Sequence, residues 1–150
     1  MQKLKVKNSG YVILESFNDY PDGELFIAEA KKNIPFSIKR VYFINSLFLH
    51  KSVRGRHAHR KLKQVIFSIN GSFSLKLDDG QNKQTIKLKS PKIGVILNKK
   101  LWMEMTDFSP NCVILVLASD YYDESDYIRN YDEFLKIAKS SERKNENTVF

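Results

Sequence analysis

The chain has little cysteine and no long apolar run, and each shortage narrows the class of protein. Its one cysteine, Cys112, lies within an apolar segment, which is typical of an inert buried thiol in a reduced intracellular protein. No apolar run reaches about 18 residues and no signal-peptide pattern occurs near the N-terminus, so neither membrane insertion nor export is indicated. We therefore expect a cytoplasmic protein without a membrane partner.

The charge is unbalanced, but the patterns of nucleic-acid-binding proteins are missing. The 25 lysine and arginine residues outnumber the 17 acidic ones and give a formal net charge of +8. The basic residues are scattered, with no basic helix, zinc-finger spacing or glycine-rich aromatic strand motif, so we do not expect nucleic acid as a partner. A basic surface around a pocket would instead suit a small phosphorylated ligand.

Short apolar or alternating segments make up most of the chain, and turn residues separate them. Asn-Gly at 70–71 and Asp-Asp-Gly at 78–80 are strong hairpin signals. Strands spaced by about 8 to 12 residues are typical of an all-β sandwich, jelly roll or barrel. The expected strands span residues 24–30, 37–44, 65–69, 73–77, 85–89, 93–97 and 112–118.

Only the C-terminal end is expected to be helical. Apolar residues recur at helical spacing within 131–139, and Asp132 is placed as an N-cap or first-turn acid. The hydrophobic content of 42% is sufficient for one domain with a sizeable core and no disulfides. We predict this domain over residues 1–140 and a polar, solvated tail over residues 141–150.

Two histidines, His57 and His59, stand one residue apart in the segment RGRHAHRK (54–61). On a strand, residues two apart point to the same face, so both imidazoles can enter one cavity. Neutral imidazole can transfer a proton near neutral pH or bind a metal, and these two uses need different neighbours. The alternative is a pair of surface histidines flanked by Arg56 and Arg60.

A second candidate group lies on the strand expected over residues 37–44. Arg40 and Tyr42 share one face of this strand with aliphatic neighbours. An arginine between aliphatic residues is costly to bury without a partner, so this face is expected to meet an anion or a carboxylate. The alternative is that Arg40 forms a structural ion pair at the open end of the sheet.

The histidine motif and the strand pattern together resemble a cupin, a small double-stranded β-helix or jelly roll. The first cupin motif has a glycine, an HxH pair, an acidic metal ligand and a later glycine. These places hold Gly55, His57, His59, Gln64 and Gly71, so the acid is missing. The second motif supplies a further histidine after a Pro-x-x-Gly turn, but no histidine follows Pro91 and Gly94 here. We therefore expect neither a metal nor another cofactor.

A narrower resemblance covers nearly the whole chain. Four segments in the right order are similar to the dTDP-4-keto-6-deoxyglucose 3,4-ketoisomerases: 33–44, 54–72, 101–109 and 112–134. The resemblance implies a metal-free cupin enzyme that moves a sugar ketone from carbon 4 to carbon 3 through an enediolate. It also implies a homodimer with exchanged N-terminal strands, and this exchange would bury apolar residues such as Val12, Leu14 and Phe26. The product would feed 3-amino-3,6-dideoxy sugars of bacterial cell-surface glycans such as lipopolysaccharide.

The resemblance also implies roles for individual residues. His57 matches the proposed base, and His59 would orient the sugar or relay a proton. Tyr42 and Arg40 would donate hydrogen bonds to a developing oxyanion or to diphosphate oxygens. The full expected set is His57, His59 and Tyr42 for catalysis, and Arg40, Arg54, Asp22, Gln64, Met103 and Glu104 for binding the dTDP-linked 4-keto-6-deoxy sugar.

Two positions depart from the family pattern. Asp22 precedes Gly23 where the family often has arginine or tyrosine, and Met103 follows Trp102 where it often has histidine or arginine. Neither side chain can donate the same protons, so the galacto or gluco configuration of the 3-keto product stays open. Two other functions also stay open: a metal-dependent cupin enzyme, and a non-catalytic cupin module that binds a sugar nucleotide or a protein partner.

Overall fold

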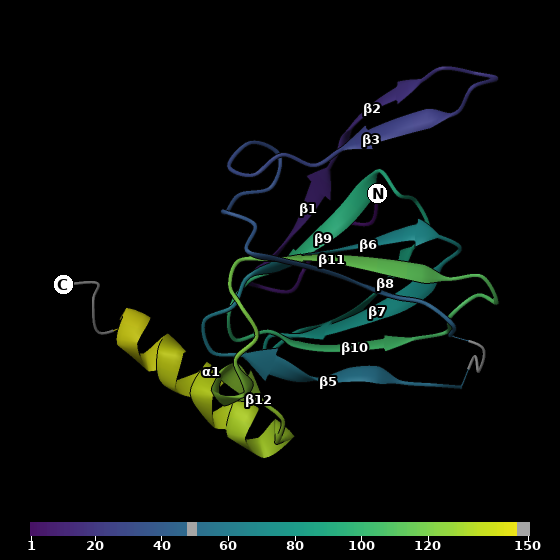
Figure 1. The fold of residues 1–150 in the computed structure, drawn as a ribbon. Coiled ribbons are helices and arrows are strands. Elements are labelled where there is room, and N and C mark those ends of the chain that lie inside the picture. Colours follow the sequence, from purple (N-terminus) through teal and green to yellow (C-terminus); the bar gives the residue numbers. More distant parts are fainter. Residues whose placement is uncertain (48–50, 147–150) are drawn as a thin grey trace.

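The computed structural model describes residues 1–47 and 51–146, and it contains two five-stranded antiparallel sheets, a separate hairpin and one α-helix (Figure 1). The predicted all-β sandwich with a C-terminal helix is confirmed. The strands are β1 (Ser9–Ile13), β2 (Glu15–Asn18), β3 (Glu24–Ile27), β4 (Arg40–Ile44), β5 (Arg54–His59), β6 (Gln64–Asn70), β7 (Phe73–Asp78), β8 (Lys83–Leu88), β9 (Ile93–Leu97), β10 (Trp102–Thr106), β11 (Val113–Ala118) and β12 (Tyr127–Ile128).

The main core lies between the two sheets. One sheet has the strand order β1-β9-β6-β11-β4, and the other has the order β12-β5-β10-β7-β8. Alternate residues of β7 and β11 point inward, which is why Phe73, Leu75 and Leu77 pack with Ile114 and Val116 in one buried cluster. Burial of these apolar side chains is the dominant stabilising contribution to such a sandwich.

A second apolar cluster covers the outer face of the first sheet. Ile34 and Phe36, from the connection between β3 and β4, pack over Val65 and Phe67 of β6. Gly94 of β9 makes this packing possible, because a Cβ there would lie 2.4 Å from the Phe67 ring. The loop between β3 and β4 therefore completes the sheet face, and β4 begins at Arg40 rather than at residue 37 as predicted.

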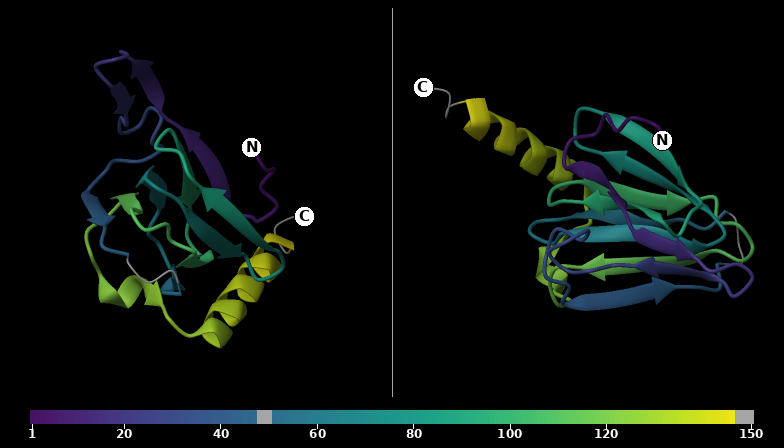
Figure 2. Two further views of the ribbon diagram at one scale, coloured as in Figure 1. Left: turned by 90° about the vertical axis from the view of Figure 1, so that its right-hand side faces the viewer. Right: turned by 90° about the horizontal axis from the view of Figure 1, so that it is seen from above.

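The hairpin of β2 and β3 projects from the sandwich (Figures 1 and 2). Its tip contains a cis peptide bond between Tyr20 and Pro21, followed by Asp22 and Gly23. The predicted strand at 24–30 ends at Ile27, and N-terminal strands were expected without bounds, which the structure gives as β1 and β2.

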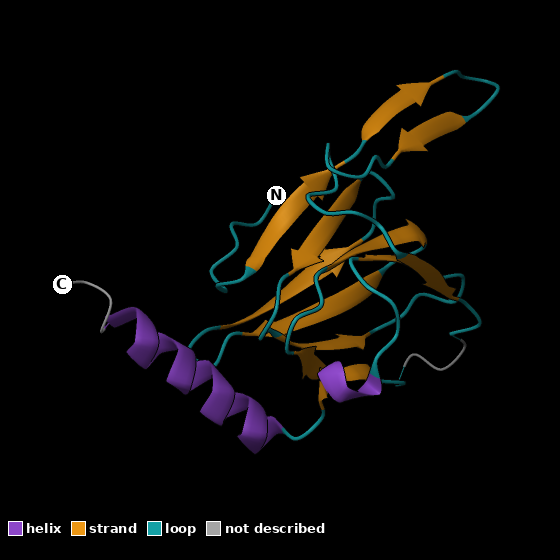
Figure 3. Ribbon diagram, turned by 60° about the vertical axis from the view of Figure 1, so that its left-hand side comes forward, coloured by secondary structure: helices purple, strands orange, loops and turns teal. Residues whose placement is uncertain are grey.

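The helix α1 (Tyr131–Glu146) lies against the second sheet and follows the short 3₁₀ turn η1 (Glu124–Asp126) and β12 in the chain (Figure 3). Its apolar face buries Phe134 against Trp102 and Ile128. The side-chain oxygen of Asn130 accepts a hydrogen bond from the backbone N–H of Glu133 at 2.9 Å and caps the first turn.

The helix is longer than predicted, so the expected end at residue 139 was wrong. It continues through 140–146, where Ser141 accepts a 2.8 Å hydrogen bond from Lys100 and Glu142 lies 3.5 Å from Lys7. Arg143 and Lys144 in the last turn also favour the helix, because cations stabilise its negative C-terminal end. No helix in the described ranges is long and apolar enough to cross a membrane.

Candidate active site

A cavity of about 400 Å³ opens between β4, β5 and the segment that carries η1 and β12. Three guanidinium groups converge on it, from Arg40, Arg54 and Arg129. Such a concentration of positive charge with planar donors suits a phosphorylated ligand. The lining residues are Arg40, Tyr42, Ile44, Arg54, Gly55, His57, Met105, Tyr122, Tyr127 and Arg129.

A β-bulge in β5 brings Arg54 and His57 to the same cavity. Met103 of β10 pairs with His57, but the next residue, Glu104, pairs with Gly55, so Arg56 is the extra residue of the bulge. Gly55 and Arg56 both have a positive φ, of 88° and 58°. A Cβ on Gly55 would lie 2.5 Å from Met103 Sδ, so the close approach of β10 requires glycine here.

The two histidines and Tyr127 form a cluster of three rings. The ring centroids of His57 and His59 are 5.0 Å apart, and Tyr127 lies 4.9 Å from His57 and 4.4 Å from His59. His57 lines the cavity, whereas His59 is only 5% exposed and does not. The two rings lie close together, but only His57 lines the cavity, so the entry of both imidazoles into one cavity stays a prediction. The alternative of a surface pair is wrong, because His59 is buried.

His57 is held in its neutral form. Burial lowers the pKa of His57 to about 4, and the neighbouring His59 contributes to this shift. The Gly55 backbone opposes the shift, but within the described chain no atom meets the buried His57 Nδ1 in hydrogen-bond geometry. His57 lines the cavity, and a neutral imidazole there can accept a proton from a bound substrate.

His59 has a carboxylate partner that the sequence did not indicate. Its Nδ1 lies 3.1 Å from Oδ2 of Asp126, the last residue of η1. Burial lowers the pKa of His59, while the Asp126 charge and hydrogen bond oppose the shift. The Asp126 carboxylate also accepts from the backbone N–H groups of Lys61 and Leu62.

Arg40 and Tyr42 lie side by side in the cavity. Arg40 Cζ is 5.3 Å from the centre of the Tyr42 ring and 5.7 Å from that of Tyr122. Arg40 Nε is buried without a hydrogen-bond partner among the described residues, and Arg40 has no salt bridge there, so the alternative of a structural ion pair is not supported. An unpaired buried donor is costly unless a ligand satisfies it.

The Tyr42 hydroxyl is a proton donor at physiological pH. Burial, followed by the influence of Tyr127, raises the pKa of Tyr42 to about 12. The hydroxyl donates a 3.1 Å hydrogen bond to Oε1 of Gln64. Gln64 is only 2% exposed and does not line the cavity. It therefore contacts Tyr42 rather than a ligand in this cavity.

A surface network that the sequence analysis missed closes one side of the cavity. Arg129 makes a bidentate ion pair with Glu124, at 2.8 and 3.0 Å, and its guanidinium lies 4.4 Å from the centre of the Tyr127 ring. The Tyr122 hydroxyl also donates to Glu124. Arg129 thus stacks on the ring that contacts both histidines.

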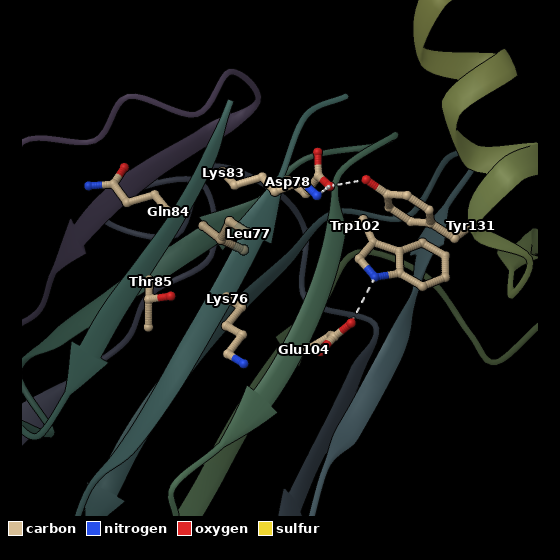
Figure 4. Close-up of a pocket in the computed structure, with 9 residues that line it drawn as sticks. All are labelled: Lys76, Leu77, Asp78, Lys83, Gln84, Thr85, Trp102, Glu104 and Tyr131. Atoms are coloured by element: carbon tan, nitrogen blue, oxygen red, sulfur yellow. Dashed lines mark hydrogen bonds and ion pairs between the residues drawn. The ribbon is translucent and has the colours of Figure 1, made fainter. Parts of the chain in front are cut away.

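Three expected binding residues lie elsewhere in this chain. Met103 is 3% exposed and belongs to the core between the sheets. Glu104, its neighbour on β10, points to the opposite face and lines a separate cavity of about 460 Å³, where Trp102 Nε1 donates to it at 3.4 Å (Figure 4). Asp22 lies in the turn between β2 and β3, the hairpin that projects from the sandwich in Figure 1. None of these three residues lines the cavity that contains His57 within one chain, and their role in binding the ligand stays a prediction.

A metal site is not evident in the described ranges, 1–47 and 51–146. They contain no group of three or more histidine, cysteine, aspartate or glutamate side chains placed to hold an ion. Transition metals in proteins generally need at least three such ligands. The groups present can instead accept a proton, donate hydrogen bonds to an oxyanion and bind phosphate oxygens.

Comparison with known proteins gives one consistent result. The family model described as "FdtA: WxcM-like, C-terminal" matches residues 7–139. A TDP-4-oxo-6-deoxy-alpha-D-glucose-3,4-oxoisomerase of Aneurinibacillus thermoaerophilus is 55% identical over 118 residues, which are 78% of this chain and 84% of that protein.

The solved structures of ketoisomerases agree in fold. The QdtA sugar 3,4-ketoisomerase of Thermoanaerobacterium thermosaccharolyticum in complex with TDP is 41% identical, with a TM-score of 0.87 over 90% of this chain and 97% of that one. A variant of QdtA in complex with TDP-4-keto-6-deoxyglucose has the same identity and TM-score, over 90% of this chain and 96% of that one. The predicted cupin fold is therefore confirmed, and this chain belongs to the FdtA, WxcM-like family of sugar 3,4-ketoisomerases.

Proposed function

We propose that this protein is a TDP-4-keto-6-deoxyglucose 3,4-ketoisomerase that works without a metal. The observation that carries the proposal is the placement of neutral His57 in a cavity with three guanidinium groups. The 55% identity to an oxoisomerase of this sugar nucleotide supports the choice of substrate.

The reaction needs a base and a stabilised enediolate. His57 takes the proton from sugar carbon 3 while the electron pair moves onto the carbon 4 carbonyl oxygen. The carbon 3 hydroxyl then loses its proton, the carbon 4 oxygen gains one, and a proton returned to carbon 4 leaves the ketone at carbon 3. Tyr42, which stays protonated because burial raises its pKa to about 12, is suited to donate to the developing oxyanion.

The diphosphate binds the arginines in this proposal. Arg40 and Arg54 have no carboxylate partner in the described part of the chain, so their charge is free for phosphate oxygens. Arg129 is already paired with Glu124, so less of its charge is free for the ligand, and its main contribution is to form part of the cavity wall.

A second protomer is part of the proposal. Phe17 and Leu25 of the hairpin are about half exposed, at 48% and 54%, and Val41 and Phe43 of the edge strand β4 are 58% and 65% exposed. Exchange of N-terminal strands in a two-fold dimer would cover such surfaces and pair the open edge. Sedimentation equilibrium at micromolar concentration is expected to give a dimer, and an active monomer would contradict this.

The dimer proposal bears on the burial of the N-terminal residues and on the position of Asp22. Of the residues expected to become buried by strand exchange, Val12 and Leu14 are already 6% exposed within one chain, whereas Phe26 is half-buried. Exchange would also carry Asp22 of the hairpin tip toward the second protomer, which is how this residue could still border a sugar. In the cell, the 3-keto product would supply an aminotransferase that makes 3-amino-3,6-dideoxy sugars for surface glycans.

Product analysis tests the proposed function. The protein is incubated with TDP-4-keto-6-deoxyglucose that carries ¹³C at carbon 4, and the product is followed by carbon NMR. The labelled carbon is expected to change from a ketone to a carbinol carbon, and its coupling pattern reveals the galacto or gluco configuration. Unchanged sugar, together with tight TDP binding, would identify a non-catalytic sugar-nucleotide-binding module.

A further inference from the structure

We propose that Asp126 is a positioning residue of the reaction, because its carboxylate fixes the tautomer of His59 behind the base. This inference rests on the proposed ketoisomerase function. It concerns Asp126, His59 and Tyr127, of which only the histidine was indicated by the sequence.

The Asp126 carboxylate is held from three sides. Oδ1 accepts from the Lys61 backbone N–H at 2.8 Å, and Oδ2 accepts from Leu62 N–H at 3.2 Å and faces His59 Nδ1 at 3.1 Å. The Asp126 carbonyl also accepts from Arg60 N–H at 2.9 Å. The carboxylate therefore has a fixed position relative to the end of β5.

This geometry selects one tautomer of His59. An ionised carboxylate can only accept hydrogen bonds, so the ring nitrogen that faces it must carry the proton. In neutral His59, whose pKa is lowered by burial, the proton is then on Nδ1 and the lone pair is on Nε2. The orientation of the ring is fixed by the same bond.

The fixed ring acts on the reaction through His57. His59 does not line the cavity, but its ring centroid is 5.0 Å from that of His57, and Tyr127, the next residue after Asp126, contacts both rings. When His57 takes the sugar proton it becomes a cation. A neighbouring imidazole that presents its lone pair, with a carboxylate behind it, stabilises that cation better than one that presents a second N–H.

If Asp126 only stabilised the local turn, its replacement by asparagine would have little effect on the reaction rate. The bonds to Lys61 and Leu62 resemble those of an aspartate that caps a turn, and an asparagine oxygen could replace most of that role. Asparagine can also donate from its amide, which would favour the opposite tautomer of His59. Asp126→Asn therefore separates the two roles with little change in size.

The first measurement is the rate. For Asp126→Asn we expect kcat to fall on the order of a hundredfold while KM changes by less than about threefold, because the substrate does not contact the altered group. Asp123→Asn is the matched control, since among the described residues the side chain of this exposed acid accepts hydrogen bonds only from Ser125 in η1 and is bonded to neither histidine. The control is expected to keep kcat within about twofold of the wild type.

The second measurement is the tautomer, read by ¹H–¹⁵N correlation of the imidazole nitrogens in the free protein. Wild-type His59 is expected to carry its proton on Nδ1, and the Asp126→Asn variant on Nε2. A wild type protonated on Nε2 would overturn the inference even if the variant does not fold.

The outcomes also separate this inference from the proposed function. A wild type that isomerises the sugar, with an Asp126→Asn variant of equal rate and switched tautomer, would overturn the role of Asp126 alone. A wild type with no isomerase activity would overturn both.

Discussion

The Tyr42 hydroxyl gives its only proton to the side-chain oxygen of Gln64, at 3.1 Å. Gln64 stands where the first cupin motif has an acidic metal ligand, so this position serves a tyrosine here rather than a metal. For Tyr42 to donate to an oxyanion, the Gln64 amide must turn and present its NH₂ group to the phenol oxygen. Glutamine permits both arrangements, and glutamate does not.

The first prediction follows from this pair. Gln64→Glu is expected to lower kcat about tenfold or more, because a carboxylate only accepts and would retain the Tyr42 proton. Tyr42→Phe should cause a similar loss, and the double variant should be no worse than Tyr42→Phe alone. Losses in kcat that simply add in this double-mutant cycle would show that the two residues act independently.

The second prediction concerns pH. Because the pKa of His57 is lowered to about 4, the base remains neutral at pH values well below the usual histidine range. The profile of kcat/KM should therefore stay level as pH falls through about 6.5 and decline only toward pH 4. An inflection near pH 6.5 in a protein that circular dichroism shows to be folded would contradict this assignment.

Stability should depend on pH in the same interval. The unfolded chain binds a proton at His57 near pH 6.5, whereas the folded chain does so only near pH 4. The contribution of neutral His57 to stability is thus fully present above about pH 6.5 and is lost as pH falls toward 4. In urea titrations, His57→Asn should lose less stability than the wild type between these pH values.

The third prediction concerns the diphosphate. Arg40→Ala should weaken TDP binding by about tenfold to a hundredfold, measured by calorimetry, while kcat at saturation changes little. Arg60→Ala is the matched control, because Arg60 forms a surface ion pair with Glu133 at 2.6 Å and does not line the cavity. Equal affinity of both variants for TDP would remove Arg40 from the binding site.

The fourth prediction concerns metal. Activity should be unchanged after dialysis against a strong chelator, since Gln64 replaces the acidic ligand of the cupin motif and the described residues contain no group of three or more ligand side chains placed to hold an ion. Loss of activity on chelation that added transition metal restores would show that a metal takes part.

Much of the fold could be predicted because a short strand depends largely on the residues within it and on the turns at its ends. Alternation and turn residues located β6, β7 and β9 to within about two residues of their ends. Met103 and Glu104 are neighbours on β10, so alternation places them on opposite faces of the sheet. The family resemblance nevertheless implied that both bind the ligand. The longer helix α1 depends on contacts with Lys7 and Lys100, which are distant in sequence and leave no local signal.

The site could be predicted only in part, for a similar reason. His57, Arg40 and Tyr42 were indicated by strand faces and by family resemblance. The bulge at Gly55 and Arg56, which turns Arg54 toward His57, depends on the register of β10. Asp126 lies 67 positions from His59 in the sequence, within a segment of acids and tyrosines typical of a solvated loop.

Exchange of the carbon 3 proton in heavy water tests the central claim, that His57 is the base, most directly. TDP-4-keto-6-deoxyglucose is incubated with the wild type, with His57→Asn and with Arg60→Ala, and the carbon 3 proton is followed by NMR. The wild type and Arg60→Ala should exchange this proton, and His57→Asn should do so on the order of a hundredfold more slowly while binding TDP with unchanged affinity. Exchange at the wild-type rate in His57→Asn would contradict the account, because the base would then lie elsewhere.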